Sequence, residues 1–453
     1  MEDAAAYREA AESALAWSLG QVRGDDGPWI PESVPADGSP AAAPVPEERD
    51  CLYRGVGGIA LALAEVRLAR DLTDEERAVA EAVRSRLVAN SPDQVDPTLY
   101  FGLAGDATAL RLVGSPDDVA LPMALLAETA TPVGWPAPLE PGGEPVPLTD
   151  VVLGSAGITM AAVWAGGRRS ADVVSAGAQA MLDTADERPS GLDWPMQVGV
   201  PRSERPRMPN YSHGAAGVAA ALAVAGEHLG RTDVVAAAVR GAEHLVAIAD
   251  LADDGFLLPT MDPHTSPDVQ TVTFTWCHGP AGTSHLFTAL AHAGVETVRD
   301  VPVAEWRRRC LHSVMTSGLP RRLRPGFWDN DGRCCGTAGV GDVILDAAQD
   351  ADDPAEAARY LAFARRLGDA LLERGVHDED GLVCWRFTEH RKDPPLLDPG
   401  VGWMQGAIGI AAFLLRLSRV VEHGLDTPVA DRPDSWWSVP ARLRASGGAA
   451  QAR

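Results

Sequence analysis

Three of the six cysteines in the sequence lie in two short stretches that could together hold a metal ion. The stretches are Trp276-Cys277-His278-Gly279-Pro280-Ala281-Gly282 and Cys334-Cys335-Gly336-Thr337-Ala338-Gly339. In both, the cysteines lie within the two residues before a Gly-x-x-Gly turn, so the two stretches align residue by residue. Three protein ligands with an open fourth position are typical of a catalytic zinc site, whereas four protein ligands are typical of a structural one. Cys277, Cys334 and Cys335 are therefore candidate metal ligands.

The remaining cysteines, Cys51, Cys310 and Cys384, are interpreted as reduced core residues, because buried free cysteine is common. The alternative for Cys277, Cys334 and Cys335 is that they too are buried, reduced cysteines. A chain of 453 residues with six cysteines needs no disulfide framework. In a reducing compartment, clustered cysteines are typical of metal binding or catalysis.

A sevenfold internal repeat would bring the two stretches together. A Gly-x-x-Gly pattern followed by an apolar run begins at Gly55, Gly102, Gly154, Gly214, Gly279, Gly336 and Gly406. The runs are rich in small apolar residues, which predicts buried helices. Amphipathic segments precede the turns near residues 3–19, 74–90, 116–129, 170–184, 232–249, 301–317 and 354–373. Seven units of outer helix, loop, glycine turn and inner helix predict an all-α fold, a double-layered α/α toroid.

In a closed toroid, equivalent positions of the repeats lie on a ring. The residues directly before each first glycine are Arg54, Phe101, Leu153, His213, His278, Cys335 and Gln405. The residues one position earlier are Tyr53, Tyr100, Val152, Ser212, Cys277, Cys334 and Met404. Three cysteines and two histidines of repeats four to six thus face the axis together. His213 is either part of the site or a core histidine, and His278 is a fourth ligand, an acid–base group or a structural donor.

Composition excludes several classes of partner. The formal net charge of −24 argues against nucleic acids and anionic membranes, because phosphate binding needs a basic surface. No run of 18 apolar residues lacks charges, which argues against a transmembrane helix. The acidic N-terminus lacks the pattern of a signal peptide, so a cytoplasmic location is expected. One lysine against 38 arginines, with abundant alanine, indicates a GC-rich bacterial source.

At these turns the sequence resembles the lanthionine synthetase C-like (LanC-like) family, the cyclases of lanthipeptide biosynthesis. The motifs are Asn210-Tyr211-Ser212-His213-Gly214-Ala215-Ala216-Gly217, Trp276-Cys277-His278-Gly279 and Cys334-Cys335-Gly336. The family fold is a sevenfold double-layered α-toroid, so the resemblance implies a single toroid domain over residues 1–425. Residues 426–453 are expected to form a C-terminal tail that is partly disordered, with a docked pair of tryptophans.

The resemblance also implies a zinc ion bound by Cys277, Cys334 and Cys335. Most single-domain members have Cys-His in the second stretch. The Cys-Cys pair found here is like that of some cyclase domains in larger synthetases. Because such domains have this three-cysteine form, zinc is expected here as well. A third thiolate makes the site more anionic, which should leave a bound substrate thiolate more nucleophilic.

The family's catalytic histidine corresponds to His213, and its acidic partner corresponds to Asp150. The structural alternative for Asp150 is a loop or capping aspartate. His278 is a further catalytic candidate and stands where bacterial cyclases often have tyrosine. Thr273 stands where an arginine is frequent. These two departures concern the acid–base groups and leave the metal ligands unaffected.

The resemblance implies that a peptide cysteine thiolate, formed at zinc, adds to the β-carbon of dehydroalanine or dehydrobutyrine in the same peptide. The product is lanthionine or methyllanthionine. The implied partners are a dehydrated precursor peptide and a dehydratase. One alternative is a LanC-like enzyme that adds glutathione or another thiol to dehydrated residues. A second alternative is a non-catalytic, zinc-stabilised binding scaffold.

Overall fold

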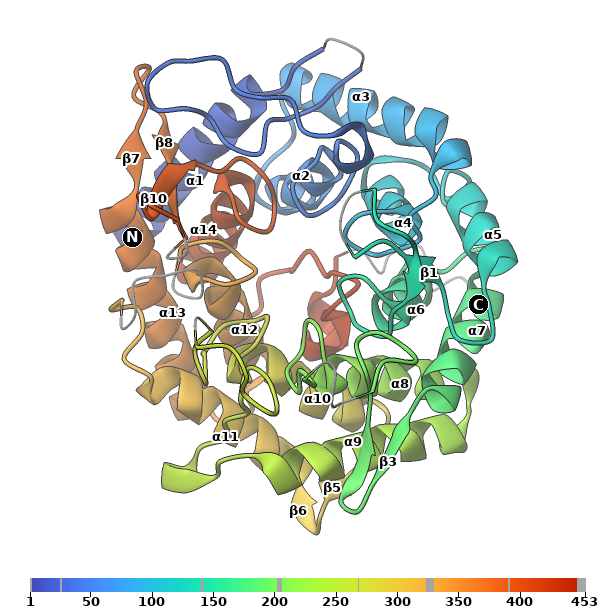
Figure 1. Ribbon diagram of the computed structural model, residues 1–453. Helices are drawn as coiled ribbons and strands as arrows, with labels where there is room; N and C mark the ends of the chain where they lie inside the picture. Colours follow the sequence, from blue (N-terminus) through green and yellow to red (C-terminus); the bar gives the residue numbers. More distant parts are fainter. Residues whose placement is uncertain are drawn as a thin grey trace.

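Two concentric rings of α-helices surround a central axis (Figure 1). The computed structural model describes residues 2–24, 27–139, 142–201, 206–267, 269–322, 330–389 and 392–445. Within these ranges the inner helices are α2 (Gly57–Ala69), α4 (Leu103–Val113), α6 (Ser155–Ala165), α8 (Ala215–Leu229), α10 (Pro280–His292), α12 (Thr337–Asp350) and α14 (Ala407–His423). The outer helices are α1 (Glu2–Gly20), α3 (Asp74–Asn90), α5 (Ala120–Thr129), α7 (Ser170–Asp183), α9 (Thr232–Ile248), α11 (Val303–Thr316) and α13 (Pro354–Arg374). The predicted all-α, double-layered α/α toroid is confirmed.

The inner ring is closed. Each inner helix packs against its two neighbours, and α14 completes the circle by packing on α2. The first outer helix, α1, packs on α14, so the two ends of the repeat array meet. No helix in the described part of the chain has both the length and the apolar composition needed to cross a membrane.

Local sequence explains where the helices lie. Every residue of α8 from Ala215 to Gly226 is buried, which its small apolar side chains permit on all faces. The outer helices keep one charged face, and their starts follow capping rules. At the start of α3, the Thr73 hydroxyl accepts the Glu76 N–H at 3.1 Å, and the Glu76 carboxylate accepts the Thr73 N–H at 2.8 Å.

At most turns the second glycine lets neighbouring repeats approach closely. A methyl group on Gly282 would overlap the carbonyl oxygen of Trp276 and lie 2.8 Å from Cβ of Tyr211 in the previous repeat. A methyl group on Gly217 would lie 2.5 Å from Cγ2 of Val151. Real Cβ atoms do not approach other atoms this closely, so side chains at these positions would push the repeats apart.

Short antiparallel hairpins decorate the loops, a feature absent from the all-α prediction. The paired strands are β1 (Pro136–Ala137) with β2 (Val146–Pro147), β3 (Asp186–Arg188) with β4 (Gly191–Asp193), β5 (Thr297–Val298) with β6 (Val301–Pro302), β7 (Val376–His377) with β8 (Val383–Cys384), and β9 (Arg386–Thr388) with β10 (Leu396–Pro399). Most lie in the long connections that lead from an outer helix to a glycine turn. They order these loops without forming a core of their own.

The C-terminal segment (residues 425–445) runs into the middle of the ring from the end opposite the glycine turns (Figure 1). Gln349, near the end of α12, donates hydrogen bonds of 2.9 Å to the carbonyl oxygens of Leu425 and Thr427, at the start of the C-terminal segment. Further along, the short helix η4 (Trp436–Ser438) packs on α10. There the Trp437 indole donates to the carbonyl oxygen of His285 at 2.9 Å. The segment therefore fills the far end of the central opening.

The tip of the C-terminal segment reaches the underside of the glycine turns. The Tyr100 hydroxyl donates to the Asp434 carboxylate at 3.1 Å, and the Tyr211 hydroxyl donates to the Asp434 carbonyl. Residues 446–453 lie outside the described residues, so the disorder predicted within 426–453 stays a prediction. The boundary placed at residue 425 also stays a prediction.

A buried cluster of ion pairs joins the C-terminal segment to the inner helices around Asp342 of α12. Arg416 lies 3.2 Å from the Asp342 carboxylate, Arg432 lies 3.7 Å from it, and Arg333 is also paired with it. Burial alone would raise the pKa of Asp342, but these arginines outweigh it and lower the pKa to about 2. Arg333 directly precedes Cys334, so the cluster also supports that glycine turn.

We expect Asp342→Asn to destabilise the fold by about 3–5 kcal/mol, because it leaves buried arginines without their shared carboxylate. Urea unfolding checks this. The matched control is Asp426→Asn, since the Asp426–Arg442 pair is 88% and 64% exposed and should contribute almost nothing.

The folded pKa of Asp342 lies below its ordinary value of 3.8. The carboxylate therefore contributes to the free energy of unfolding above pH 3.8, and this contribution is lost as pH falls towards 2. The difference between wild type and Asp342→Asn should therefore shrink in acid. Equal stability of wild type and Asp342→Asn at neutral pH would contradict the role of the cluster.

Candidate metal centre and acid–base groups

Backbone hydrogen bonds run around the axis and join the glycine turns to one another. Each connects the residue two positions before the first glycine in one repeat to the equivalent residue of the next. The N···O distances are 3.3 Å for Val152 to Ser212, 3.0 Å for Ser212 to Cys277, 3.2 Å for Cys277 to Cys334, 2.9 Å for Cys334 to Met404, 3.0 Å for Met404 to Tyr53 and 3.1 Å for Tyr53 to Tyr100. We call these six bonds the axial backbone ring, which is open between Tyr100 and Val152. It bonds Cys277 directly to Cys334, although they belong to different repeats.

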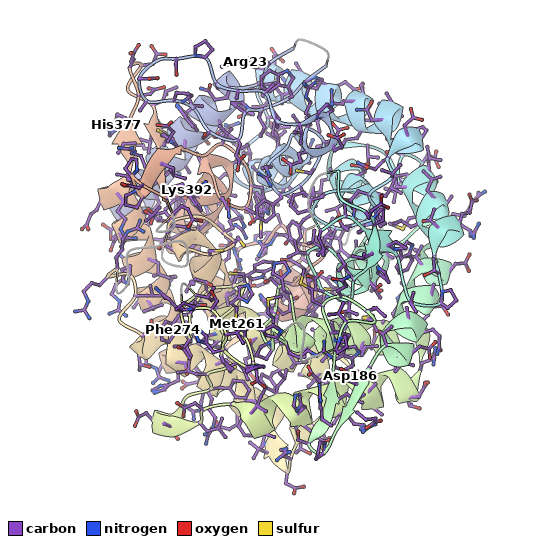
Figure 2. The ribbon with its side chains drawn as sticks, in the orientation of Figure 1. Arg23, Asp186, Met261, Phe274, His377 and Lys392 are labelled. Atoms are coloured by element: carbon purple, nitrogen blue, oxygen red, sulfur yellow. The ribbon has the colours of Figure 1, made fainter. Side chains whose placement is uncertain are left out.

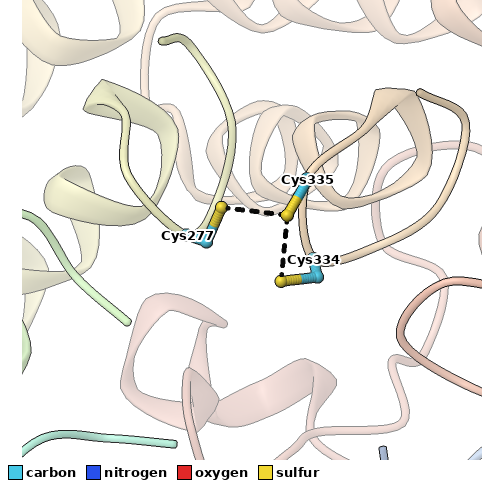
Figure 3. Close-up of side chains that lie close together, drawn as sticks. All are labelled: Cys277, Cys334 and Cys335. Atoms are coloured by element: carbon cyan, nitrogen blue, oxygen red, sulfur yellow. Dashed lines mark hydrogen bonds between the residues drawn. The ribbon is translucent and has the colours of Figure 1, made fainter. Parts of the chain in front are cut away.

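The three predicted ligands converge at the axial backbone ring (Figure 3). The Cys335 sulfur lies 3.3 Å from the sulfurs of both Cys277 and Cys334, and all three sulfurs lie within 4.8 Å of one another. Zinc–sulfur bonds of about 2.3 Å place tetrahedral thiolates about 3.8 Å apart, so the cluster fits one zinc-sized ion with little movement. Within the described residues, no other group of three potential ligands is this close.

The charge state of the cluster also suits a divalent cation. Burial raises the pKa of the Cys277 and Cys335 thiols well above the ordinary range. Hydrogen bonds from these two thiols lower the pKa of Cys334 well below that range, so Cys334 is the most acidic of the three thiols. A cation is needed to ionise the other two sulfurs in this buried position.

Asp150 and His213 form a hydrogen-bonded pair beside the cluster. Asp150 is fully buried, and its Oδ1 accepts the N–H of Leu153 at 2.7 Å. Its Oδ2 lies 2.5 Å from Nδ1 of His213, whose side chain is 25% exposed. A carboxylate only accepts hydrogen bonds, so Nδ1 of His213 carries the proton and Nε2 is the atom left for chemistry. Asp150 thus caps its turn and orients the histidine.

The pKa values of the two axial histidines, His213 and His278, are shifted in opposite directions. Burial alone would lower the pKa of His213, but the Asp150 carboxylate and the Cys334 thiolate outweigh it and raise the pKa. Burial, and then the charge of His213, lower the pKa of His278 to about 3. The ring centroids are 5.6 Å apart, so the two rings lie side by side. The shifts therefore favour the protonated form for His213 and the neutral form for His278.

Two further side chains contact the thiol cluster and were not predicted as site residues. The Tyr53 phenol hydrogen-bonds the Cys334 sulfur, and the Thr275 hydroxyl lies 3.3 Å from the Cys277 sulfur. Thr273 hydrogen-bonds Thr275 at 3.4 Å, so it belongs to this polar chain. Tyr53 stands in the same column of the repeat alignment as Cys277 and Cys334. That register could have identified it.

Comparison with known proteins adds independent evidence. A family model described as lanthionine synthetase C-like protein matches residues 46–423. Nisin cyclase is similar in structure, with a TM-score of 0.56 and 16% sequence identity over 83% of this chain and 89% of that one. An unsaturated glucuronyl hydrolase from Bacillus sp. GL1 matches with a TM-score of 0.45 and 12% identity over 95% of this chain and 98% of that one. No curated protein sequence matches the chain.

We expect Asp150→Asn to lower the pKa of His213 below its ordinary value of 6.5, because burial then acts without the carboxylate. NMR titration of labelled histidine checks this, with exposed Asp352→Asn as the control that leaves His213 unchanged. In the wild type the raised pKa stabilises the fold below pH 6.5, and this contribution is lost as pH rises through the folded pKa. An unshifted His213 in Asp150→Asn would contradict the pairing.

Proposed function

The chain belongs to the lanthionine synthetase C-like family, and on this premise we propose that it is a zinc-dependent lanthipeptide cyclase. The family and the nisin cyclase-like fold support a cyclase-type role. The observation that carries the specific proposal is the buried three-cysteine cluster beside the Asp150–His213 pair. The reaction joins the thiol of a peptide cysteine to the β-carbon of dehydroalanine or dehydrobutyrine. The S–H adds across the double bond, so no atom is lost.

Cys277, Cys334 and Cys335 would hold the zinc ion, in agreement with their mutual distances. When bound, zinc supplies a Lewis acid with one position for the peptide sulfur, whose thiol it deprotonates at neutral pH. The three cysteine thiolates outweigh the ion's two positive charges. We propose that this excess negative charge keeps the peptide sulfur nucleophilic.

His213 is the proposed proton donor to the α-carbon. Addition of sulfur at the β-carbon places negative charge on the enolate of the dehydrated residue, which must then gain a proton. The raised pKa of His213 keeps a proton available near neutral pH, and Asp150 stabilises the charged imidazole. After transfer, His213 regains a proton from solvent, to which its side chain is partly open.

His278 is proposed to act as a neutral group in the same site. Burial lowers its pKa to about 3, which favours the neutral imidazole at neutral pH. It lies against His213 and directly follows the ligand Cys277 in the chain. A neutral imidazole there can orient the peptide by hydrogen bonding and limit water near the enolate.

The chemistry specifies the partners. The electrophile comes from dehydrated serine or threonine in a ribosomally made peptide, so a dehydratase must act before this protein. The candidate ligands must stay reduced to bind metal, which fits the proposed cytoplasmic location in a bacterial cell. The substrate is therefore a dehydrated precursor peptide with free cysteines.

We expect Cys277→Ala to lose zinc and to abolish cyclisation, because it removes one of three ligands. His213→Asn should keep zinc but cyclise about 10²–10⁴-fold more slowly, because it removes only the acid. Cys310→Ala, a buried cysteine of α11 outside the cluster, is the control that keeps both properties. Metal analysis measures zinc. Loss of alkylatable thiol in a dehydrated peptide measures cyclisation, which leaves the mass unchanged.

Full cyclisation by zinc-free Cys277→Ala would overturn the proposal. If the wild type consumed added glutathione and left peptide cysteines free, the activity would be thiol addition to dehydrated residues. If zinc were held but no thiol were consumed, the scaffold alternative would be supported.

A further inference from the structure

A cavity of about 420 Å³ lies on the glycine-turn face, between the last repeat and the first. Its walls include Tyr53 and Gln405 of the axial columns and two apolar side chains, Phe387 and Leu397, from the β9–β10 hairpin. Lys392, labelled in Figure 2, belongs to the same wall. The mechanism described above does not use this cavity.

Tyr53 connects the cavity to the metal centre. Tyr53 lines the cavity, and its phenol hydrogen-bonds the Cys334 sulfur. The ring stacks on Phe101 at 5.3 Å, with 18° between the ring planes, which fixes its position. The cavity therefore lies one side chain away from the sulfur cluster.

The cavity and the acid–base groups lie on opposite sides of the cluster. The cysteines come from repeats five and six. Asp150 and His213 come from repeats three and four, whereas Tyr53 and Gln405 come from repeats one and seven. A peptide with its sulfur at the cluster can thus extend both ways around the axis. The reacting double bond must lie towards His213, so the other side is left for the rest of the chain.

The peptide cannot extend through the ring. The C-terminal segment fills the end opposite the glycine turns, and Asp434 meets Tyr100 and Tyr211 directly beneath them. Both parts of the peptide must therefore stay on the glycine-turn face. The cavity is the hollow on this face that adjoins the cluster away from His213.

We propose that this cavity binds the residues that directly flank the reacting cysteine of the substrate peptide, while the dehydrated residue lies over His213. This inference rests on the proposed cyclase function and assigns a specificity site to it. The cavity then determines which cysteines of a peptide can react, through the size and charge of their neighbours.

The lining predicts which neighbours fit. Phe387 and Leu397 offer apolar contact, and the lining contains three acidic residues, Glu32, Glu389 and Asp398, but only two cationic ones. One cation, Arg54, is already engaged by Glu32 at 2.9 Å and by a second glutamate at 3.2 Å. Acidic neighbours of the cysteine are therefore disfavoured, and neutral apolar neighbours are favoured.

Binding of short labelled peptides tests the inference without any reaction. Each peptide carries one cysteine and no dehydrated residue, and fluorescence anisotropy measures its affinity for the zinc-loaded full chain. Leu397→Trp should weaken binding of an alanine-flanked peptide by about tenfold or more, because the cavity is filled. Leu396→Trp is the matched control, since the adjacent residue of β10 is 44% exposed and does not line the cavity. Zinc content should be unchanged in both.

Replacing the flanking alanines by aspartate should weaken binding to the wild type by about tenfold. N-acetylcysteine amide, which has no flanking residues, should bind wild type and Leu397→Trp equally. Equal binding of the peptide to both tryptophan variants would overturn the cavity assignment and leave the cyclase proposal standing. Failure of the zinc-loaded wild type to bind any cysteine peptide or the small thiol would overturn both.

Discussion

The axial backbone ring is the constraint on which the rest of the structure depends. It joins the residues that precede the glycine turns, so repeats far apart in sequence present their side chains at one axis. Close approach requires glycine at the second turn position, as at Gly217 and Gly282, where a methyl group would meet the neighbouring repeat. The same bonds place Cys277 beside Cys334 and leave the side chains free for chemistry. Main-chain hydrogen bonds thus hold the site together, so few side chains are needed for that purpose.

Around this axis the functional groups are arranged by charge. On one side of the thiol cluster, Asp150 holds His213 in one tautomer and favours its protonated form. Below the turns, arginines gathered on Asp342 tie the C-terminal segment to the turn that carries Cys334. The far end of the opening is filled, so substrate chemistry is confined to the glycine-turn face. These three features place the acid–base pair on one side of the cluster and the C-terminal segment beneath it.

Much of this arrangement follows from the sequence, because the repeat register converts spacing into position. Seven glycine turns predicted the toroid, and the column before each glycine predicted that Cys277, Cys334 and Cys335 would meet. The pairing of Asp150 with His213 came from family resemblance, since no periodicity places an aspartate near a histidine. Tyr53 stands in the same register, but a phenol is not one of the usual zinc ligands, so its residue type gave no signal for the site. The path of the C-terminal segment depends on long-range contacts such as Asp434 with Tyr100, which leave no local signal.

X-ray absorption at the zinc edge tests the central claim most directly. The claim is that three cysteines of this chain hold zinc and leave one position for a peptide sulfur. The zinc-loaded protein alone should show three sulfur ligands and one lighter atom. A cysteine peptide without dehydrated residues should replace the lighter atom, giving four sulfur ligands. A resting site that already has four protein ligands, for example with nitrogen from His278, and that does not change when peptide is added would contradict the account.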